Sequence, residues 1–488
     1  MGKKKKDIIH LERESVIPIL KHKLIAALSD RIEKRSDRDE FLKLCQRVEY
    51  TIRAWYLLQF EDLMQLYALF EPIHGAKKLQ QQNLSPEDID TCEHQFLSCL
   101  FQVMEKSNFK ITTDDEINVA LSAQYRLNLP IVVDETKLDK KLFTRYFAKH
   151  PHDNLPDFAD KFIVFRRGFG IDKMTAFFIK QKINTIIARI WKCFLTITCL
   201  KALFFSKPRD EESRTDSKSV EICIDSDEDD LYVERIRIEK MKLSFCNLFG
   251  KNTIQEPVFQ SIIVVYRRKG SKKEAERNIY VKHFRNIPMA DMEIVLPEKK
   301  NPGLTPMDWV KFIVSAVIGL VTVISSLSSP TADIRVIFAI LTSVVGYCVK
   351  TYFTFQSNLV SYQSLITQSV YNKQLDSGRG TLLHLCDDVI QQEVKEVIVS
   401  FFVLMEQGTA SRKELDQRCE DLIKQEFGEN CNFDVDDAVQ KLEKLGLIVQ
   451  DTRGSYTCVD LRHANDKIGT TTEEMVMKAK RGNNTSRY

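Results

Sequence analysis

The sequence has 488 residues, of which 43% are hydrophobic and 28% charged, and its formal net charge is +3. This length allows two to four domains, each with its own core, and the composition excludes a wholly disordered chain. A net charge so close to zero argues against a protein devoted to nucleic acid. The twelve cysteines are scattered singly without CxxC spacing, which favours reduced thiols over a disulfide framework.

The first quarter of the chain, residues 1–126, is predicted to be a helical N-terminal region. Its opening stretch MGKKKKDIIHLERES is neither a signal nor a transit peptide, because acidic residues follow the lysines directly and no apolar core is present. Large apolar side chains then recur at helical spacing in FLKLCQRVEYTIRAWYLLQF. Ser85 and Thr113 each precede an acidic residue by three positions, as helix caps do.

Two stretches that are far apart in the chain resemble each other. PDFADKFIVFRR (Pro156–Arg167) and PVFQSIIVVYRR (Pro257–Arg268) align without a gap at an offset of 101 residues. Each lies in a unit that reads as strand, short helix, proline turn and strand. We therefore predict a duplicated β-α-β sheet element, with a first α+β repeat over 127–206 and a second over 232–300, whose strands pair in one sheet. Chance similarity between two β-rich strands is the alternative.

Both stretches end in a pair of arginines, which are candidate contacts for an anion or a partner. If the units are duplicates, Arg166 and Arg167 should be placed equivalently to Arg267 and Arg268. Together with Lys269 these arginines could also contact nucleic acid. Paired arginines at strand ends are more often edge charges, so nucleic acid ranks last among the functions considered.

Two contrasting segments separate the duplicates. Lys173 to Lys207 contains no acidic residue and reads as a basic apolar helix, which either lies at a membrane surface or is buried with its basic groups reaching solvent. Residues 207–231 are acidic and are expected to form a disordered linker. Within the linker, VEICIDSDEDD resembles a SUMO-interacting motif and Ser226 is a candidate phosphosite, although a solvating linker explains both patterns.

Residues 307–356 hold two uncharged apolar blocks, Phe312–Leu327 and Val336–Val349, joined by a turn. A helix that crosses a membrane needs about 20 residues, and lysines and aromatic residues at the ends can extend each block to that length. We predict a two-helix transmembrane hairpin with both flanking regions on the cytosol-like side; a hairpin buried in a soluble core is the alternative. The residues expected to position the hairpin in the bilayer are Trp309, Lys311, Gly319, Arg335, Val345 and Lys350.

Residues 357–464 are predicted to form a long helix and a winged-helix-like domain, and a C-terminal helix and tail follow over 465–488. Ser411 opens a capping box with Glu414, and a further helix is expected from Val435 to Leu445 before two strands. Three helices followed by a β-hairpin give the outline of a winged helix. Because the last of these helices carries more acidic than basic residues, it repels phosphate, and we expect it to dock protein rather than DNA.

The motif DSGRG (Asp376–Gly380) at the start of the long helix could form an anion-binding nest with Arg379; a flexible joint is the simpler alternative. His384 lies near Asp387 and Asp388, as it would on an ordinary helix surface. HExxH, GxSxG, the Walker A loop and GxGxxG do not occur, and no pair of histidines has metal-ligand spacing on a helix. The sequence therefore predicts no catalytic, cofactor-binding or metal-binding residue.

Two stretches resemble a known family. NIPMADMEIVLPEKKNPGLTPMDWVKF and YNKQLDSGRGTLLHLCDDVIQQEVKE are similar to domain-of-unknown-function family 3754, which is widespread in plants and related to animal transmembrane protein 143. The similarity extends over nearly the whole chain and is most like that of a plant member. It implies an integral membrane protein, and the animal relative implies the mitochondrion as a location. Some plant members are labelled aminopeptidases, a label that the motif content does not support.

These observations together predict a multidomain α+β protein that is integral to a membrane. We expect a non-catalytic, membrane-anchored scaffold or adaptor whose cytosol-facing domains bind proteins through the winged-helix-like module and the acidic linker, with membrane lipid as a further partner. The alternative is a membrane-bound hydrolase or lipid-active enzyme whose site the motifs do not reveal. No cofactor is expected, and nucleic acid is not an expected partner.

Overall fold

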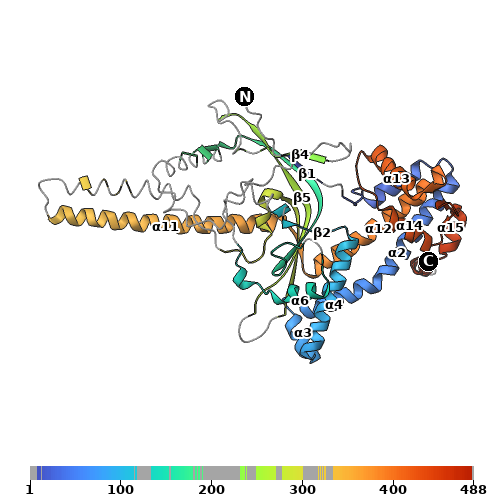
Figure 1. The fold of residues 1–488 in the computed structure, drawn as a ribbon, viewed down its shortest axis with the longest axis horizontal. Helices are drawn as coiled ribbons and strands as arrows, with labels where there is room; N and C mark the ends of the chain where they lie inside the picture. The colour runs from blue at the N-terminus through green and yellow to red at the C-terminus, as the bar shows by residue number, and fades with distance from the viewer. Residues whose placement is uncertain are drawn as a thin grey trace.

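The computed structural model of this chain has a mixed α+β fold, with a sheet at its centre and helices to either side (Figure 1). The acidic linker with Ser226, and also Trp309 and Lys311, lie outside the described residues, so the predictions made for them are untested. The structure describes residues 8–11, 14–114, 116–117, 133–152, 155–179, 231–236, 249–270, 277–300 and 334–485, with isolated positions at 182–183, 185–186, 189–190, 238, 317, 319, 321 and 324–325.

A five-stranded antiparallel sheet forms the middle of the molecule, in the order β2-β3-β5-β6-β7. Its long strands are rich in β-branched and aromatic residues, as in FIVF and SIIVVY, which fit a pleated surface. A separate two-stranded pair joins β1 (Ile8–Leu11) to β4 (Leu231–Glu234). The five strands are β2 (Lys110–Ile111), β3 (Phe162–Ala176), β5 (Asn252–Arg267), β6 (Ile279–Pro288) and β7 (Gln374–Ser377).

The two similar stretches pair with each other in this sheet, as predicted. β3 and β5 run antiparallel, with Phe162 opposite Tyr266 and Arg167 opposite Ser261. In this register, paired residues have numbers of the same parity and share a face of the sheet. Because side chains alternate between faces along a strand, the odd offset of 101 sends matching residues to opposite faces.

The arginine pairs are therefore not placed equivalently, and that part of the prediction is wrong. Arg167 and Arg267 face the helical layer, where they meet carboxylates of helices α12 (Arg379–Gln407) and α4 (Pro86–Lys106). Arg166 and Arg268 face the other side of the sheet, where they meet Glu116 and Glu298. The two strands thus resemble each other in sequence, but their matching residues lie on opposite faces of the sheet.

Three long helices cover one face of the sheet and share a core with it: α2 (Arg35–Phe70), α4 (Pro86–Lys106) and α12 (Arg379–Gln407). The opposite face of the sheet holds a second core, which includes Val264 and the 3-10 helix η3 (Met289–Ile294). The shorter helices of this part are α1 (Lys21–Asp30), α3 (Gly75–Gln82), α6 (Lys141–Lys149) and the 3-10 helix η1 (Glu135–Lys137).

Two helix starts predicted from capping patterns are confirmed. At the start of α4, the Ser85 hydroxyl accepts a hydrogen bond from the backbone N–H of Asp88 at 3.1 Å, and Pro86 occupies the first helical position. At Ser411, the capping box is complete. The Ser411 hydroxyl accepts from the N–H of Glu414 at 3.4 Å, and the Glu414 carboxylate accepts from the N–H of Ser411 at 2.8 Å.

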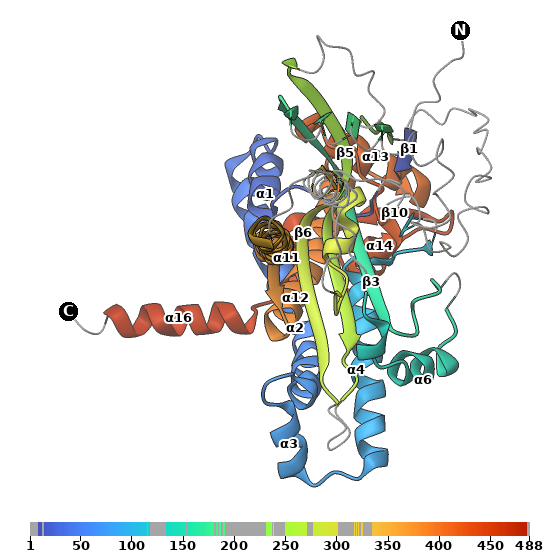
Figure 2. The same cartoon turned by 90° about the vertical axis from the view of Figure 1, so that its left-hand side faces the viewer.

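The C-terminal part of the chain adds further helices and a small sheet. A three-stranded antiparallel sheet has the order β8-β10-β9. Figure 2 shows α16 reaching away from the rest of the chain, and its first turn is held by Glu474, which accepts from Arg47 of α2 at 2.6 Å. The elements are β8 (Ala410–Ser411), α13 (Arg412–Phe427), α14 (Val435–Lys444), β9 (Ile448–Gln450), β10 (Ser455–Cys458), α15 (Leu461–Ile468) and α16 (Thr472–Thr485).

Helix α11 (Ile334–Lys373) is a single helix of 40 residues, or about 60 Å at 1.5 Å per residue. It extends far beyond the sheet (Figure 1), and near its C-terminal end Ile366 packs against Ile294 of η3. A Cβ atom added to Gly319 would lie 3.8 Å from the Tyr347 ring, so this position of the predicted hairpin lies beside α11.

No helix among the described residues is both long enough and apolar enough to cross a membrane. The predicted two-span integral membrane protein, with both termini on the cytosol-like side, is therefore wrong. The uncharged block Val336–Val349 has 14 residues, or about 21 Å of helix, against a hydrocarbon core of about 30 Å. Past Lys350, α11 continues with many polar residues. The bilayer positions expected for Gly319, Arg335, Val345 and Lys350 depended on this hairpin, so they are not retained. The first block, Phe312–Leu327, lies mostly outside the described residues.

Candidate functional site

The clearest group of polar and titratable side chains among the described residues is a polar stripe along α12. His384, Asp388, Gln392 and Glu396 recur at intervals of four residues, which places them on one side of the helix. From Gln392 to Leu404 every residue of α12 is buried. Polar groups on a helix that is enclosed all round must find partners inside the protein.

At the beginning of α12, the DSGRG motif is a tight packing arrangement. A Cβ atom on Gly380 would lie 2.2 Å from a carboxylate oxygen of Asp376, and one on Gly378 would lie 2.8 Å from the Tyr67 hydroxyl. Gly378 also has a φ of +60°. The Asp376 carboxylate thus already lies against the helix start, 3.5 Å from His384 Nε2. Arg379 is exposed, and its role in an anion-binding nest stays a prediction.

One turn further along α12, the stripe meets the sheet. Asp388 accepts a hydrogen bond from the Arg167 guanidinium at 2.6 Å. Nearby, Ser261 Oγ and His283 Nε2 lie 2.5 Å apart, which joins β5 to β6. Burial, with the Arg167 charge second, lowers the pKa of His283 to about 4. Ser261 is 7% and His283 4% exposed, so neither side chain is open to solvent as a nucleophile and base should be.

The four arginines predicted as anion or partner contacts are each paired with carboxylates of this chain. Arg166 meets Glu14 at 3.0 Å and Glu116 at 2.6 Å. Arg267 meets Glu93 at 2.5 Å and Asp139 at 3.6 Å, and it is 7% exposed. Arg167 and Arg268 have the partners given above. Their contact with an external anion stays a prediction. In the structure, their ion pairs connect the sheet to the layers that cover its two faces.

At the far end of the stripe lies a buried charge cluster, which we define as Tyr56, Glu393, Glu396, Asp437 and Lys441. It joins α2, α12 and α14. The Tyr56 hydroxyl donates to Glu393 at 2.8 Å, and the Lys441 ammonium contacts both Glu393 and Asp437. An oxygen of Glu396 and one of Asp437 lie within 4.8 Å of each other, and two carboxyl groups that share a buried place favour holding one proton between them.

Burial sets the protonation of the charge cluster. It raises the pKa of Glu396 well above the usual range and also raises the pKa of Asp437. It lowers the pKa of Lys441 to about 7, with the charge of Lys106 acting in the same direction. Glu396 accepts a hydrogen bond from Gln392 at 2.7 Å. Because Glu396 is the more deeply buried of the two acids, we place the shared proton on it.

The charge cluster also offers the spacing of a metal site. Oxygen atoms of Glu393, Glu396 and Asp437 all lie within 4.8 Å of one another. However, the Lys441 ammonium contacts two of these three carboxylates and so takes the position that a cation would occupy. We therefore interpret the cluster as a buried ion-pair arrangement and assign no metal to it.

Other helices engage both lysines of α14, one in the interior and one at the surface. Lys441 is 6% exposed within the charge cluster. The Lys444 ammonium lies 4.3 Å from the centre of the Trp55 ring on α2, a cation–π contact. Asp436 and Asp437 occupy the first turn of the same helix. Both lysines of α14 therefore have partners on neighbouring helices.

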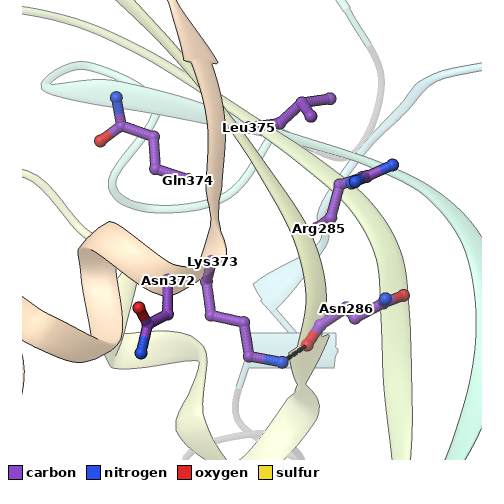
Figure 3. Close-up of a pocket in the computed structure, with 6 residues that line it drawn as sticks. All are labelled: Arg285, Asn286, Asn372, Lys373, Gln374 and Leu375. Atoms are coloured by element: carbon purple, nitrogen blue, oxygen red, sulfur yellow. Dashed lines mark hydrogen bonds between the residues drawn. The ribbon is translucent and has the colours of Figure 1, made fainter.

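A hollow of about 250 Å³ lies where α11 passes into β7, at the edge of the sheet. The pairing of β6 with β7 shifts register between His283 and Phe284, and Asn286 has a φ of +50°. Figure 3 shows the Lys373 ammonium reaching the Asn286 carbonyl, at 2.6 Å, while the Asn286 and Gln374 side chains point away from each other. The polar groups do not converge, so we attribute the hollow to the local separation of two strands.

The sequence contained a signal for the polar stripe that motif reasoning missed. The run HLCDDVIQQEVKEVIVSFFVLM places polar residues four apart inside a long apolar helix, which is a pattern of internal partners rather than of a surface. The partners themselves could not be found from local sequence, since Tyr56 lies 337 residues from Glu393.

Residues 259–380 match the family described as "Protein of unknown function (DUF3754)". The match runs from β5 through β6, η3, α11 and β7 to the DSGRG motif, and it confirms the family resemblance over this part of the chain. The closeness to plant members and the relation to animal transmembrane protein 143 stay predictions. No curated protein and no solved structure matches the chain. The description of this family names no function, so a function can be proposed only from the geometry of the structure.

Proposed function

We propose that this protein works by binding other proteins through its C-terminal unit, which we interpret as a winged helix. Helices α12, α13 and α14 precede the β9–β10 hairpin, and β8 between α12 and α13 adds the third strand of the small sheet. This chain order and sheet order are those expected of a winged helix. Helix-turn-helix proteins that bind DNA place the corresponding recognition helix, here α14, in the major groove.

The observation that carries the proposal is that other helices engage both lysines of α14, Lys441 in the interior and Lys444 at the surface. A recognition helix reads DNA with exposed basic and amide side chains, and phosphate contacts need free positive charge. In this protein Lys441 is enclosed by carboxylates and Lys444 lies on Trp55. At the start of the helix Asp437 lies in the charge cluster, and Asp436 lies at the surface where it neutralises Arg412, a base that phosphate would need.

The small sheet offers a surface that suits a protein partner. β9 is an edge strand of the order β8-β10-β9, and Val449 at its centre is 60% exposed. Edge strands can accept a strand from another chain through main-chain hydrogen bonds. The hairpin therefore combines an apolar side chain with an edge that can extend the sheet.

The proposal is tested by site-specific crosslinking. A photo-reactive amino acid is placed at Val449, and the same group at Lys77 of α3 serves as the exposed control position. We expect discrete protein adducts from position 449 that survive nuclease and are absent from position 77. In parallel, anisotropy with labelled duplex DNA and RNA should show no binding that weakens steeply between about 50 and 200 mM salt. Salt-dependent nucleic-acid binding, or no adduct specific to position 449, would reject the proposal.

A further inference from the structure

The contact between α14 and α12 brings acidic side chains together. Oxygen atoms of Glu396 on α12 and Asp437 on α14 lie within 4.8 Å of each other, and an oxygen of Glu393 lies within the same distance of both. Glu396 is 3% exposed and accepts a hydrogen bond from the Gln392 amide at 2.7 Å. Carboxyl groups that share so buried a place favour holding one proton between them. If both acids were ionised, two negative charges would meet at the helix junction.

The charged groups that face this carboxyl pair come from each helix packed around it. α12 contributes Glu393, and α14 contributes Lys441 and Asp434. α2 contributes the Tyr56 hydroxyl, and α4 contributes Lys106, whose ammonium donates to Tyr56 at 3.3 Å. On the far side of α12, Lys395 donates to the Ile17 carbonyl and faces the N-terminal segment. With the proton in place, the charges of Lys441, Lys106 and Lys395 balance those of Glu393, Asp437 and Asp434.

We propose that the Glu396–Asp437 carboxyl pair is a proton-operated latch that holds α14 against α12. When the shared proton is present, the junction is neutral overall and closed. When the proton is lost, the junction carries a surplus negative charge in a buried place, and α14 separates from α12 and α2. Separation would free Lys441 and Lys444 and expose the face of α14 that now packs on the body of the protein.

The direction of the pH effect follows from the sign of the pKa shift. Burial raises the pKa of Glu396 in the closed state, whereas in the open state it returns toward its ordinary value of 4.5. The closed state therefore keeps a proton that the open state releases, and closure weakens as pH rises above about 4.5. Lys441, whose pKa is about 7 in the closed state, is charged between pH 5 and 6, where the carboxyl pair sets the slope alone. Toward pH 7 the closed state begins to lose the Lys441 proton, which makes the dependence shallower.

The test is hydrogen exchange of the α14 amides, Val435–Lys444, between pH 5 and 7, with the rates corrected for intrinsic exchange. One proton linked to opening changes the opening equilibrium up to about tenfold per pH unit, or at most about 100-fold over this range. Glu396→Gln keeps a donor for Asp437 without a titrating proton and should flatten the dependence. Glu406→Gln, on the exposed end of the same helix, should leave it unchanged. If Glu396→Gln does not fold, Asp437→Asn makes the reciprocal test.

A corrected exchange rate that does not change with pH, or an equal slope in Glu396→Gln and the unaltered protein, would overturn the latch. The latch would regulate the docking unit proposed above. Only this regulatory role rests on the proposed function, because the pH-dependent opening itself does not require a partner. The exchange measurement contains neither partner nor nucleic acid. If crosslinking from Val449 fails while exchange follows pH, the latch stands and the protein-binding role does not.

Discussion

The ion pair between Arg235 and Glu256 gives a sharp test of how buried charge stabilises this fold. Arg235 follows β4 and Glu256 lies on β5, and their side chains are 2% and 0% exposed. Arg235 Nε lies 3.0 Å from both carboxylate oxygens, and Glu256 also accepts from the Ala290 N–H at 3.1 Å. The pair therefore joins the β1–β4 ribbon to the large sheet and to η3.

We expect Arg235→Met to lower the free energy of unfolding by about 3–5 kcal/mol, because it leaves the Glu256 carboxylate buried without its cation. The Coulomb attraction of a charge pair at 3.0 Å with an effective dielectric constant of about 20 is about 5.5 kcal/mol, and desolvation offsets part of it, which brings it into that range. The double variant Arg235→Met/Glu256→Met removes both charges and should recover most of the loss. The assay is urea denaturation followed by circular dichroism and by intrinsic fluorescence.

The matched control is Arg31→Met, which breaks the pairs of an exposed arginine with Glu406 and Glu426. Its side chain is 32% exposed, so this change should cost no more than about 1 kcal/mol. An Arg235→Met protein as stable as Arg31→Met would refute the reasoning. So would a double variant less stable than Arg235→Met alone, since that would mean that Glu256 contributes through contacts other than the ion pair.

Three further outcomes can be checked with the same assay. Since the pKa of His283 falls from 6.5 to about 4 on folding, stability should decrease as pH falls through this window by up to about 3 kcal/mol, and His283→Gln should remove that part of the acid dependence. Gly380→Ala should destabilise by about 1–3 kcal/mol, because its methyl group meets Asp376, whereas Gly346→Ala in open space on α11 should stabilise by up to about 1 kcal/mol. Ser411→Ala should cost about 1 kcal/mol through loss of the α13 cap, and Ser411→Asp should restore most of it.

Local patterns predicted local structure well in this chain. The capping signals at Ser85 and Ser411 depend on side chains three residues apart, and both helices begin there. The pairing of β3 with β5 was also predictable, because two apolar strands of similar sequence were interpreted as copies of one element that complete the same sheet. The faces of the arginines were not predictable, since they depend on the register in which the two strands pair as well as on the odd offset.

The transmembrane hairpin shows where pattern reasoning went wrong. Apolar blocks of this length are too short to span a bilayer without help, and the prediction extended them with flanking Lys311 and Lys350. Within α11 the apolar block is the first part of a much longer helix that continues to Lys373. The charge cluster was out of reach for another reason, because its members come from three helices that are brought together only by the tertiary fold.

The central position of α12 has a consequence for co-translational folding of the protein on the ribosome. The main core takes side chains from Ile17 to Ala464, and its axis is the contact of α2 with α12, where the rings of Phe41 and Phe402 lie 5.6 Å apart. α2 is complete at residue 70, but its partner helix ends at Gln407. At about 5–20 residues per second, the apolar side of α2 waits roughly 20–70 s for that partner. During synthesis the N-terminal helices therefore need a chaperone or a temporary partner, and slowing of translation before α12 should raise the fraction that aggregates.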